Sequence, residues 1–393
     1  MSDPSSPATP EQPSARAACE TAGMTPEQLA EAKRYGRLEL IATLADRALD
    51  LFYLGSVALL AAWPVDAWLR HWQRLENASL RLLVLFVLMT AAHVAVSFPL
   101  SFWSGHVLEH RFQLSNLSFG GWLWRYTKRN LLALLLGMPL VLGLYWMIWT
   151  TGGWWWLAAA GAFFLVSVVL GQLAPVLILP LFYKIERLEA PELAERIAAL
   201  ARGTGLSIEG VYRIALSAET VKANAMLAGL GRTRRVLLGD TLLEGFTADE
   251  IEVIFAHEIG HQVFHHIRKM IVAGIFYSAA GFFVCDRLLA FWVGGGAAPD
   301  YYAHFPVAAM PAIMFILTVF GMLLEPLINA VSRRYERQCD HYALERTGRR
   351  AAYLSAFRKL AQLNKDDPCP HPLEVFLFHS HPPIAERLAA AEQ

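Results

Sequence analysis

Two histidines, His257 and His261, enclose a glutamate in the segment His257-Glu258-Ile259-Gly260-His261. On a helix, positions i and i+4 lie one turn apart on the same face, so both imidazoles can reach one metal ion. Zinc held in this way lowers the pKa of water to about 7, and a neighbouring carboxylate can then take a proton from that water. The pattern predicts a hydrolytic zinc site with Glu258 as its general base.

A zinc site with two histidines needs a third protein ligand and leaves the fourth position open. Glu336 is the candidate, because it lies in a segment predicted to be the helical continuation of an apolar run. Asp340 follows four residues later, on the same face of that helix. We expect Glu336 to bind the ion and Asp340 to orient one histidine through its second ring nitrogen.

Six apolar runs are long enough to cross a bilayer, which takes about 20 residues. They cover residues 49–68, 82–103, 131–149, 154–182, 270–293 and 305–324. Two of them separate His261 from Glu336, and an even number of crossings returns the chain to the same side of the membrane. Composition agrees, because 17% of the residues are charged, against about 25% in a typical soluble domain.

Lysine and arginine gather on one side of the predicted membrane. They follow the second, fourth and sixth runs and precede the fifth, whereas the opposite side has three arginines in one loop and almost none elsewhere. The positive-inside rule then places the N-terminus, residues 183–269 and the C-terminus in the cytoplasm. Abundant arginine and alanine are typical of a GC-rich bacterial genome, so we expect an inner-membrane protein.

The fold class that follows is mainly α, a multi-pass helical bundle with a cytosolic catalytic domain containing a small β-sheet. We expect a polar tail with a short amphipathic helix at 1–36, a membrane domain of four spans at 37–183, and a metallopeptidase domain at 184–393 that includes the last two spans. Strands are predicted at 211–215, 223–227 and 235–238. Thr247 and Glu250 form a predicted capping box at the start of the helix that carries the metal motif.

Two further features of the sequence limit the possible functions. The net charge is zero, which gives no support for nucleic acid as a partner. The four cysteines are scattered without paired spacing, so we expect reduced thiols: Cys19, Cys285, Cys339 and Cys369.

Taken together, several motifs resemble the type I CAAX prenyl proteases, integral-membrane zinc peptidases of the gluzincin class. The matching segments are residues 257–261, 332–340, 380–383 and 386–387, with further similarity at 109–115, 180–184 and 224–225. The resemblance covers roughly residues 25–390. The chain departs from it at Cys339, where the family usually has alanine, and lacks the additional N-terminal span of the eukaryotic branch.

The resemblance implies a barrel of membrane helices around a large water-filled chamber capped by the catalytic domain. It implies that Asn224 and Ala225 lie on an edge strand that pairs with the substrate backbone. It also implies that His381 and Arg387 stabilise the tetrahedral intermediate and the carboxylates of the zinc site. The expected partners are a peptide or protein substrate, prenylated or not, and the lipid bilayer; the expected cofactor is one zinc ion.

The sequence leaves two other functions open. Turnover of membrane proteins in quality control would use the same chemistry on other substrates. A channel or transporter with a structural zinc would use the six spans, although three ligands and an open position argue against a structural site. The roles of four ionisable residues stay open: His93, His265, His266 and Glu325.

Overall fold

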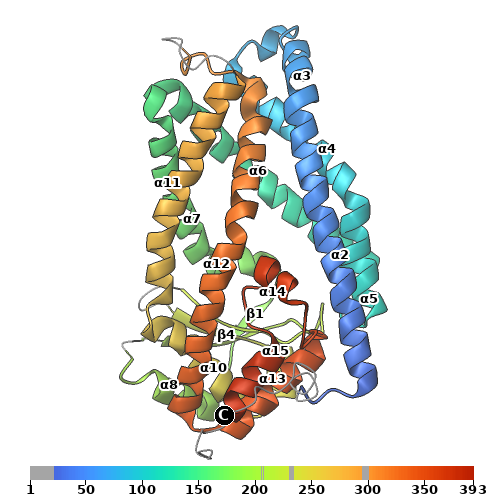
Figure 1. Cartoon of the computed structure of the whole chain (residues 1–393), viewed down its shortest axis with the longest axis vertical. Helices are drawn as coiled ribbons and strands as arrows, with labels where there is room; N and C mark the ends of the chain where they lie inside the picture. Colours follow the sequence, from blue (N-terminus) through green and yellow to red (C-terminus); the bar gives the residue numbers. More distant parts are fainter. Residues whose placement is uncertain (1–21, 205, 207, 230–233, 294–300) are drawn as a thin grey trace, which may run out of the picture.

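The computed structural model describes residues 22–204, 206, 208–229, 234–293 and 301–393. Long helices run side by side along most of the molecule, and a small sheet with several short helices gathers at one end (Figure 1). This end carries the metal motif, so the molecule consists of a helical bundle and a catalytic end.

The long helices account for the six expected spans. They are α2 (Pro26–Ser56) continuing into α3 (Ala62–Leu69), α4 (Ala78–Phe102), α6 (Phe119–Thr151), α7 (Trp155–Leu173), α11 (His266–Trp292) and α12 (Met310–Thr347). Five continuous helical runs are long and apolar enough to cross a membrane within the described ranges, and the run Phe119–Leu181 holds both α6 and α7. These two helices are joined by a tight turn at Gly152, whose positive φ of 56° suits glycine.

The helix α2 corrects one expectation. The predicted short amphipathic helix near 26–37 and the first span are one helix, which begins at a capping box between Thr25 and Gln28. Its polar half is held by tertiary contacts: Tyr35 is buried, with its ring centroid 5.2 Å from that of Phe112, and its hydroxyl accepts from Lys222 Nζ at 3.0 Å. The domain boundary expected at residue 36 therefore falls inside α2, where hydropathy changes but the backbone does not.

Among the described residues, two large apolar cores stand out beside two smaller clusters. One lies among the membrane helices and includes Leu82, Tyr145 and Trp155. The other lies in the catalytic end and includes Ile259 and Tyr353. Outside the first core, large apolar side chains such as Phe276 and Phe291 are exposed, as expected of residues that face lipid.

The sheet has four strands in the order β1-β2-β4-β3. They are β1 (Ile185–Arg187), β2 (Ile208–Ile214), β3 (Ala225–Ala228) and β4 (Arg234–Gly239). The strands β2 and β4 are parallel and the other pairs antiparallel. The three predicted strands correspond to β2, β3 and β4, and β3 lies at an edge; most of the turn expected between β3 and β4 lies outside the described residues.

Shorter helices complete the catalytic end. They are α8 (Pro191–Ala201), α9 (Asp240–Gly245), α10 (Ala248–Val263), α13 (Arg350–Asn364), α14 (Pro372–Phe378) and α15 (Ile384–Glu392). The helix α5 (Glu109–Arg111) instead ends the helical run that begins with α4. Of the helices at the catalytic end, α14 lies between α12 and α2 and points into the bundle (Figure 1).

The expectation of four reduced cysteines is wrong for Cys369, which is disulfide-bonded. Cys285 and Cys339 are free and buried, as expected, and Cys19 lies outside the described residues. Spacing along the chain misses this bond because a disulfide depends on the distance between Cα atoms in the fold, not on separation in the sequence.

Asp240 holds the loop between β2 and β3 against the end of β4. Its buried carboxylate accepts hydrogen bonds from the backbone N–H groups of Leu216 and Ser217, each at 2.8 Å, and from Ser217 Oγ at 2.6 Å. Burial alone would raise the pKa of Asp240, but these hydrogen bonds lower it below the usual range.

We predict that Asp240→Asn lowers the free energy of unfolding by about 1.5–3 kcal/mol at pH 7, the range for hydrogen bonds to a charged group. Because the folded-state pKa is depressed, this stabilisation is complete above the unfolded-state pKa of about 3.9 and is lost as pH falls through the folded-state value. Thermal unfolding in detergent should show the wild type and variant converging below pH ~4. The exposed neighbour Glu244, changed to Gln, is the control; a gap that stays constant with pH contradicts the assignment.

Candidate active site

The helix α10 is anchored at its start and presents the metal motif further along. Thr247 Oγ1 accepts from the backbone N–H of Glu250, and the Glu250 carboxylate accepts from the N–H of Thr247, which confirms the predicted capping box. Glu250 also binds Ser355 at 2.6 Å and Lys359 at 2.8 Å, both on α13. These contacts hold the start of α10 against α13.

Glu336 on α12 faces both histidines of the motif. Its Oε2 lies 3.1 Å from His257 Nε2, and its Oε1 lies 3.3 Å from His261 Nε2. Neighbouring ligands of a tetrahedral zinc ion, with bonds of 2.0–2.2 Å, are separated by about 3.4 Å. Glu336 Oε2 is buried and has no hydrogen-bond partner within the described part of the chain. The donor set and its spacing therefore fit a bound metal ion.

Cys339 is a second side chain near the histidines. Its Sγ and one nitrogen each of His257 and His261 lie within 4.8 Å of one another. However, Cys339 is fully buried and packs against Gly260, where an added Cβ would lie 3.1 Å from its Cα and Sγ. Its place is the contact between α10 and α12, whereas Glu336 borders an open cavity. We therefore favour Glu336 over Cys339 as the third ligand.

Asp340 lies between one histidine and a buried arginine. His257 Nδ1 is 2.9 Å from Asp340 Oδ1, and Arg387 donates to both carboxylate oxygens, at 2.9 Å from Nε and 2.5 Å from Nη2. Burial alone would lower the pKa of His257, but Asp340 and Glu336 raise it to about 9. The carboxylates thus favour positive charge at this position, as a cation site requires.

A cavity of about 570 Å³ opens beside these residues. Seven of the nine predicted site residues line it: Asn224, Ala225, His257, Glu258, Glu336, His381 and Arg387. The remaining two, His261 and Asp340, contact members of this group directly. A second cavity of about 830 Å³ shares Glu39 and Thr43 of α2 with the first, which makes the interior a polar space that extends into the bundle.

The two groups suited to proton transfer and hydrogen bonding differ in their surroundings. Burial raises the pKa of Glu258, although His257 and His261 act in the opposite direction. His381 Nε2 lies 3.6 Å from Glu336 Oε1. Burial and the neighbouring Arg387 lower the pKa of His381, despite Glu336, so its imidazole is neutral at pH 7. The site thus offers a carboxylate base and a neutral imidazole in one cavity.

The strand β3 leaves a free hydrogen-bonding edge at this cavity. The N–H of Gly239 donates to the carbonyl of Asn224 at 2.9 Å, and Ala225 lies opposite Leu238 in the antiparallel pair. Hydrogen-bonded and non-hydrogen-bonded pairs alternate along such a pair. The N–H and C=O of Ala225 therefore point away from β4, towards the unpaired edge.

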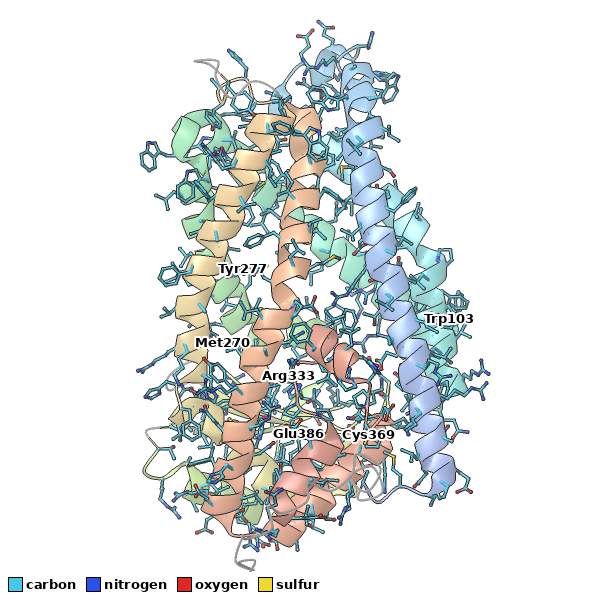
Figure 2. All side chains as sticks on the ribbon, in the orientation of Figure 1. Trp103, Met270, Tyr277, Arg333, Cys369 and Glu386 are labelled. Atoms are coloured by element: carbon cyan, nitrogen blue, oxygen red, sulfur yellow. The ribbon has the colours of Figure 1, made fainter. Side chains whose placement is uncertain are left out.

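Two buried residues of α12 escaped the sequence analysis. Arg333 Nη1 donates to the carbonyls of Val375 and His379, at 2.8 and 2.5 Å, and Asn329 Nδ2 donates to that of Leu377 at 3.0 Å. These bonds hold the C-terminal end of α14, just before His381. Figure 2 places Arg333 where α12 passes α14. The signal in the sequence is a polar stripe at helical spacing through Asn329, Arg333, Glu336 and Asp340.

The residues left open also have partners. Within the bundle, His93 Nε2 lies 2.8 Å from Asp50 Oδ1, and Glu325 forms a two-point ion pair with Arg47 at 2.5 and 2.7 Å. His265 occupies a left-handed position between α10 and α11. His266 contacts His261, with the two Nδ1 atoms 3.2 Å apart.

Comparison with known proteins identifies relatives over nearly the whole chain. The metalloprotease YhfN of Bacillus subtilis (strain 168), described as uncharacterized, is 29% identical over 382 residues, 94% of this chain and 87% of its own. CAAX prenyl protease 1 of Saccharomyces cerevisiae is 30% identical over 332 residues, which cover 78% of this chain and 70% of the yeast protein. The crystal structure of S. mikatae Ste24p matches with a TM-score of 0.81 at 24% identity, over 94% and 90% of the chains, and shows that the fold is shared.

Two family profiles divide the chain between them. The profile described as CAAX prenyl protease N-terminal, five membrane helices, matches residues 15–184, and that of Peptidase family M48 matches residues 187–393. The second match covers more than half of the chain, and its region contains both the motif helix and Glu336. The chain therefore belongs to peptidase family M48 and is a multi-pass membrane metalloprotease.

Proposed function

We propose that this protein hydrolyses peptide bonds of membrane-associated peptides, including isoprenylated CAAX-type peptides, with one zinc ion held by His257, His261 and Glu336. The observation that carries this proposal is the approach of both Glu336 oxygens to the two Nε2 atoms, at 3.1 and 3.3 Å. Glu258 and an unpaired strand edge border the same cavity. A peptide bound to that edge would place its scissile bond close to both the metal ligands and Glu258.

Bound zinc would supply a Lewis acid and acidify water at the open fourth position. Glu258 takes the proton of the attacking water and later gives it to the leaving amine nitrogen. Neutral His381 donates a hydrogen bond to the oxygen that becomes negatively charged, an effect of a few kcal/mol when the donor is preorganised. Arg387 acts through Asp340, which it holds against His257.

The substrate backbone pairs with the free edge of β3. The N–H and C=O of Ala225 supply the pairing, and the exposed side chain of Asn224 reaches the peptide from the adjacent position. This is the strand-addition mode, in which main-chain hydrogen bonds give affinity largely independent of sequence.

The substrate class follows from position and from relatives. The cavity is lined by residues of α2, α10, α13 and α14 together with Glu336 of α12. These helices come together where the bundle meets the catalytic end (Figure 1). An isoprenyl anchor in the bilayer holds its peptide near this height. The relatives named CAAX prenyl protease 1 support the same class. We place the catalytic end in the cytoplasm and the bundle in a bacterial inner membrane, as the positive-inside rule indicates.

We predict that Glu258→Gln reduces kcat on a farnesylated CAAX peptide by about 10²–10⁴-fold, the usual contribution of a general base. A quenched fluorescent peptide, farnesylated or unmodified, serves as substrate in detergent. Glu252→Gln is the matched control on the same helix, because Glu252 forms ion pairs with Arg196 and Arg349 and does not line the cavity. Full activity of Glu258→Gln rules out the proposed base.

The same assay tests substrate class and orientation. Cleavage of the farnesylated peptide alone supports the isoprenylated class, and equal cleavage of both peptides favours broad quality control. Inverted inner-membrane vesicles, which expose the cytoplasmic face, should cut added peptide, whereas intact spheroplasts should not. The reverse result contradicts the proposed orientation.

We predict that Ala225→Pro lowers kcat/KM about tenfold or more, because proline removes an outward N–H without breaking a bond to β4. One lost hydrogen bond of about 1–1.5 kcal/mol corresponds to that factor. Bound zinc, measured by mass spectrometry, should be unchanged. Ala225→Ser keeps the N–H and should cleave normally; wild-type cleavage by the proline variant would exclude strand addition at this position.

A further inference from the structure

His266, the first residue of α11, is held on three sides. It is 1% exposed, and its ring stacks on that of Tyr335, with centroids 4.0 Å apart and planes within 9°. Its Nδ1 lies 3.2 Å from His261 Nδ1, and its Nε2 lies 3.0 Å from Gln338 Oε1. Stacking fixes the plane of the ring, and the two polar contacts fix its rotation within that plane.

A break in the helix brings the two imidazoles together. Residues five apart point in different directions on a continuous α-helix. Here α10 ends at Val263, and His265 adopts the left-handed conformation with φ of 56°. The chain turns at this point, so that the ring of His266 comes back against that of His261. Its partners on α12, which are Tyr335, Gln338 and Cys339, lie within three residues of Glu336 in the sequence.

We infer that His266 is a positioning residue that fixes the tautomer and ring orientation of His261. This inference rests on the proposed zinc site. A histidine that presents the Nε2 lone pair to an ion carries its proton on Nδ1. The facing Nδ1 of His266 must then accept, which places the proton of His266 on Nε2, where it donates to Gln338 Oε1. The Sγ of Cys339 lies 3.7 Å from the same Nδ1 and is a weaker second neighbour of this acceptor. With the protons placed in this way, a donor faces an acceptor at both contacts from His261 to Gln338.

The two histidine ligands are therefore supported by different chemistry. His257 is held by the carboxylate of Asp340, and His261 by a neutral imidazole. The site already contains the carboxylates of Glu258, Glu336 and Asp340, against one guanidinium, that of Arg387. A neutral acceptor orients the second ligand without adding another negative charge to a buried site.

Zinc affinity of the metal-free protein in detergent, measured against a chelating competitor, tests this inference. His266→Phe keeps a stacking ring but cannot accept, so the Kd for zinc should rise about 10–100-fold, as when other partners of ligand histidines are removed. His266→Asn places an amide oxygen near the position of Nδ1 and should restore most of the affinity. Cobalt substitution gives a second readout, because the visible bands should change in the Phe variant and not in the Asn variant.

Two further variants keep the test decisive. Gln338→Leu leaves His266 in place but removes the acceptor of its Nε2–H, and we expect an intermediate loss of affinity. His265→Asn is the control, since asparagine tolerates the left-handed conformation. Unchanged melting temperatures without metal show that the variants fold. Wild-type affinity and cobalt spectrum in both His266→Phe and Gln338→Leu would overturn the inference, as would equal losses in His266→Phe and His266→Asn.

Discussion

The close contact between α10 and α12 is the constraint on which the site depends. Gly260 lies against Cys339, and a Cβ on the glycine would come within 3.1 Å of the cysteine. Only small residues allow two helices to approach this closely. The approach brings Glu336 to the two histidines of α10 and Asp340 to the outer nitrogen of His257. The small side chain of Cys339 allows this contact.

The helix α12 organises most of the remaining chemistry. Its first half is apolar, and its second half, at the catalytic end, carries a buried polar face. Along that face, Asn329 and Arg333 hold the end of α14, and Glu336 and Asp340 complete the metal site. One helix therefore carries both Glu336, the candidate ligand, and Asp340, which supports His257. The same helix also holds the segment that bears His381. This common attachment suits a site whose groups must be preorganised for the transition state.

The sequence predicted the elements with strong local signals. The spacing of His257 and His261 is a helical pattern, Thr247 with Glu250 is a capping pattern, and both are present. The four-residue spacing of Glu336 and Asp340 also predicts that both side chains lie on one face of a helix. The six spans follow from length and hydropathy alone, and the edge strand at Ala225 from alternation and from family resemblance.

The missed features depend on distances between segments remote in sequence. The contact of His266 with His261 requires a helix break at His265, and no pattern in the sequence predicts this break. The partners of Arg333 are main-chain carbonyls of a remote segment, which have no side-chain pattern in the sequence. The disulfide of Cys369 and the continuity of α2 likewise arise from tertiary packing. Local spacing cannot report such contacts.

The central claim is that two imidazoles and the carboxylate of Glu336 hold the metal. X-ray absorption at the zinc edge of the purified protein tests it most directly, because sulfur ligands lie at about 2.3 Å and nitrogen or oxygen ligands at about 2.0–2.2 Å. The account predicts nitrogen and oxygen neighbours only, with the multiple-scattering signature of two imidazoles. A sulfur neighbour at about 2.3 Å would contradict it and would place Cys339 in the position assigned to Glu336.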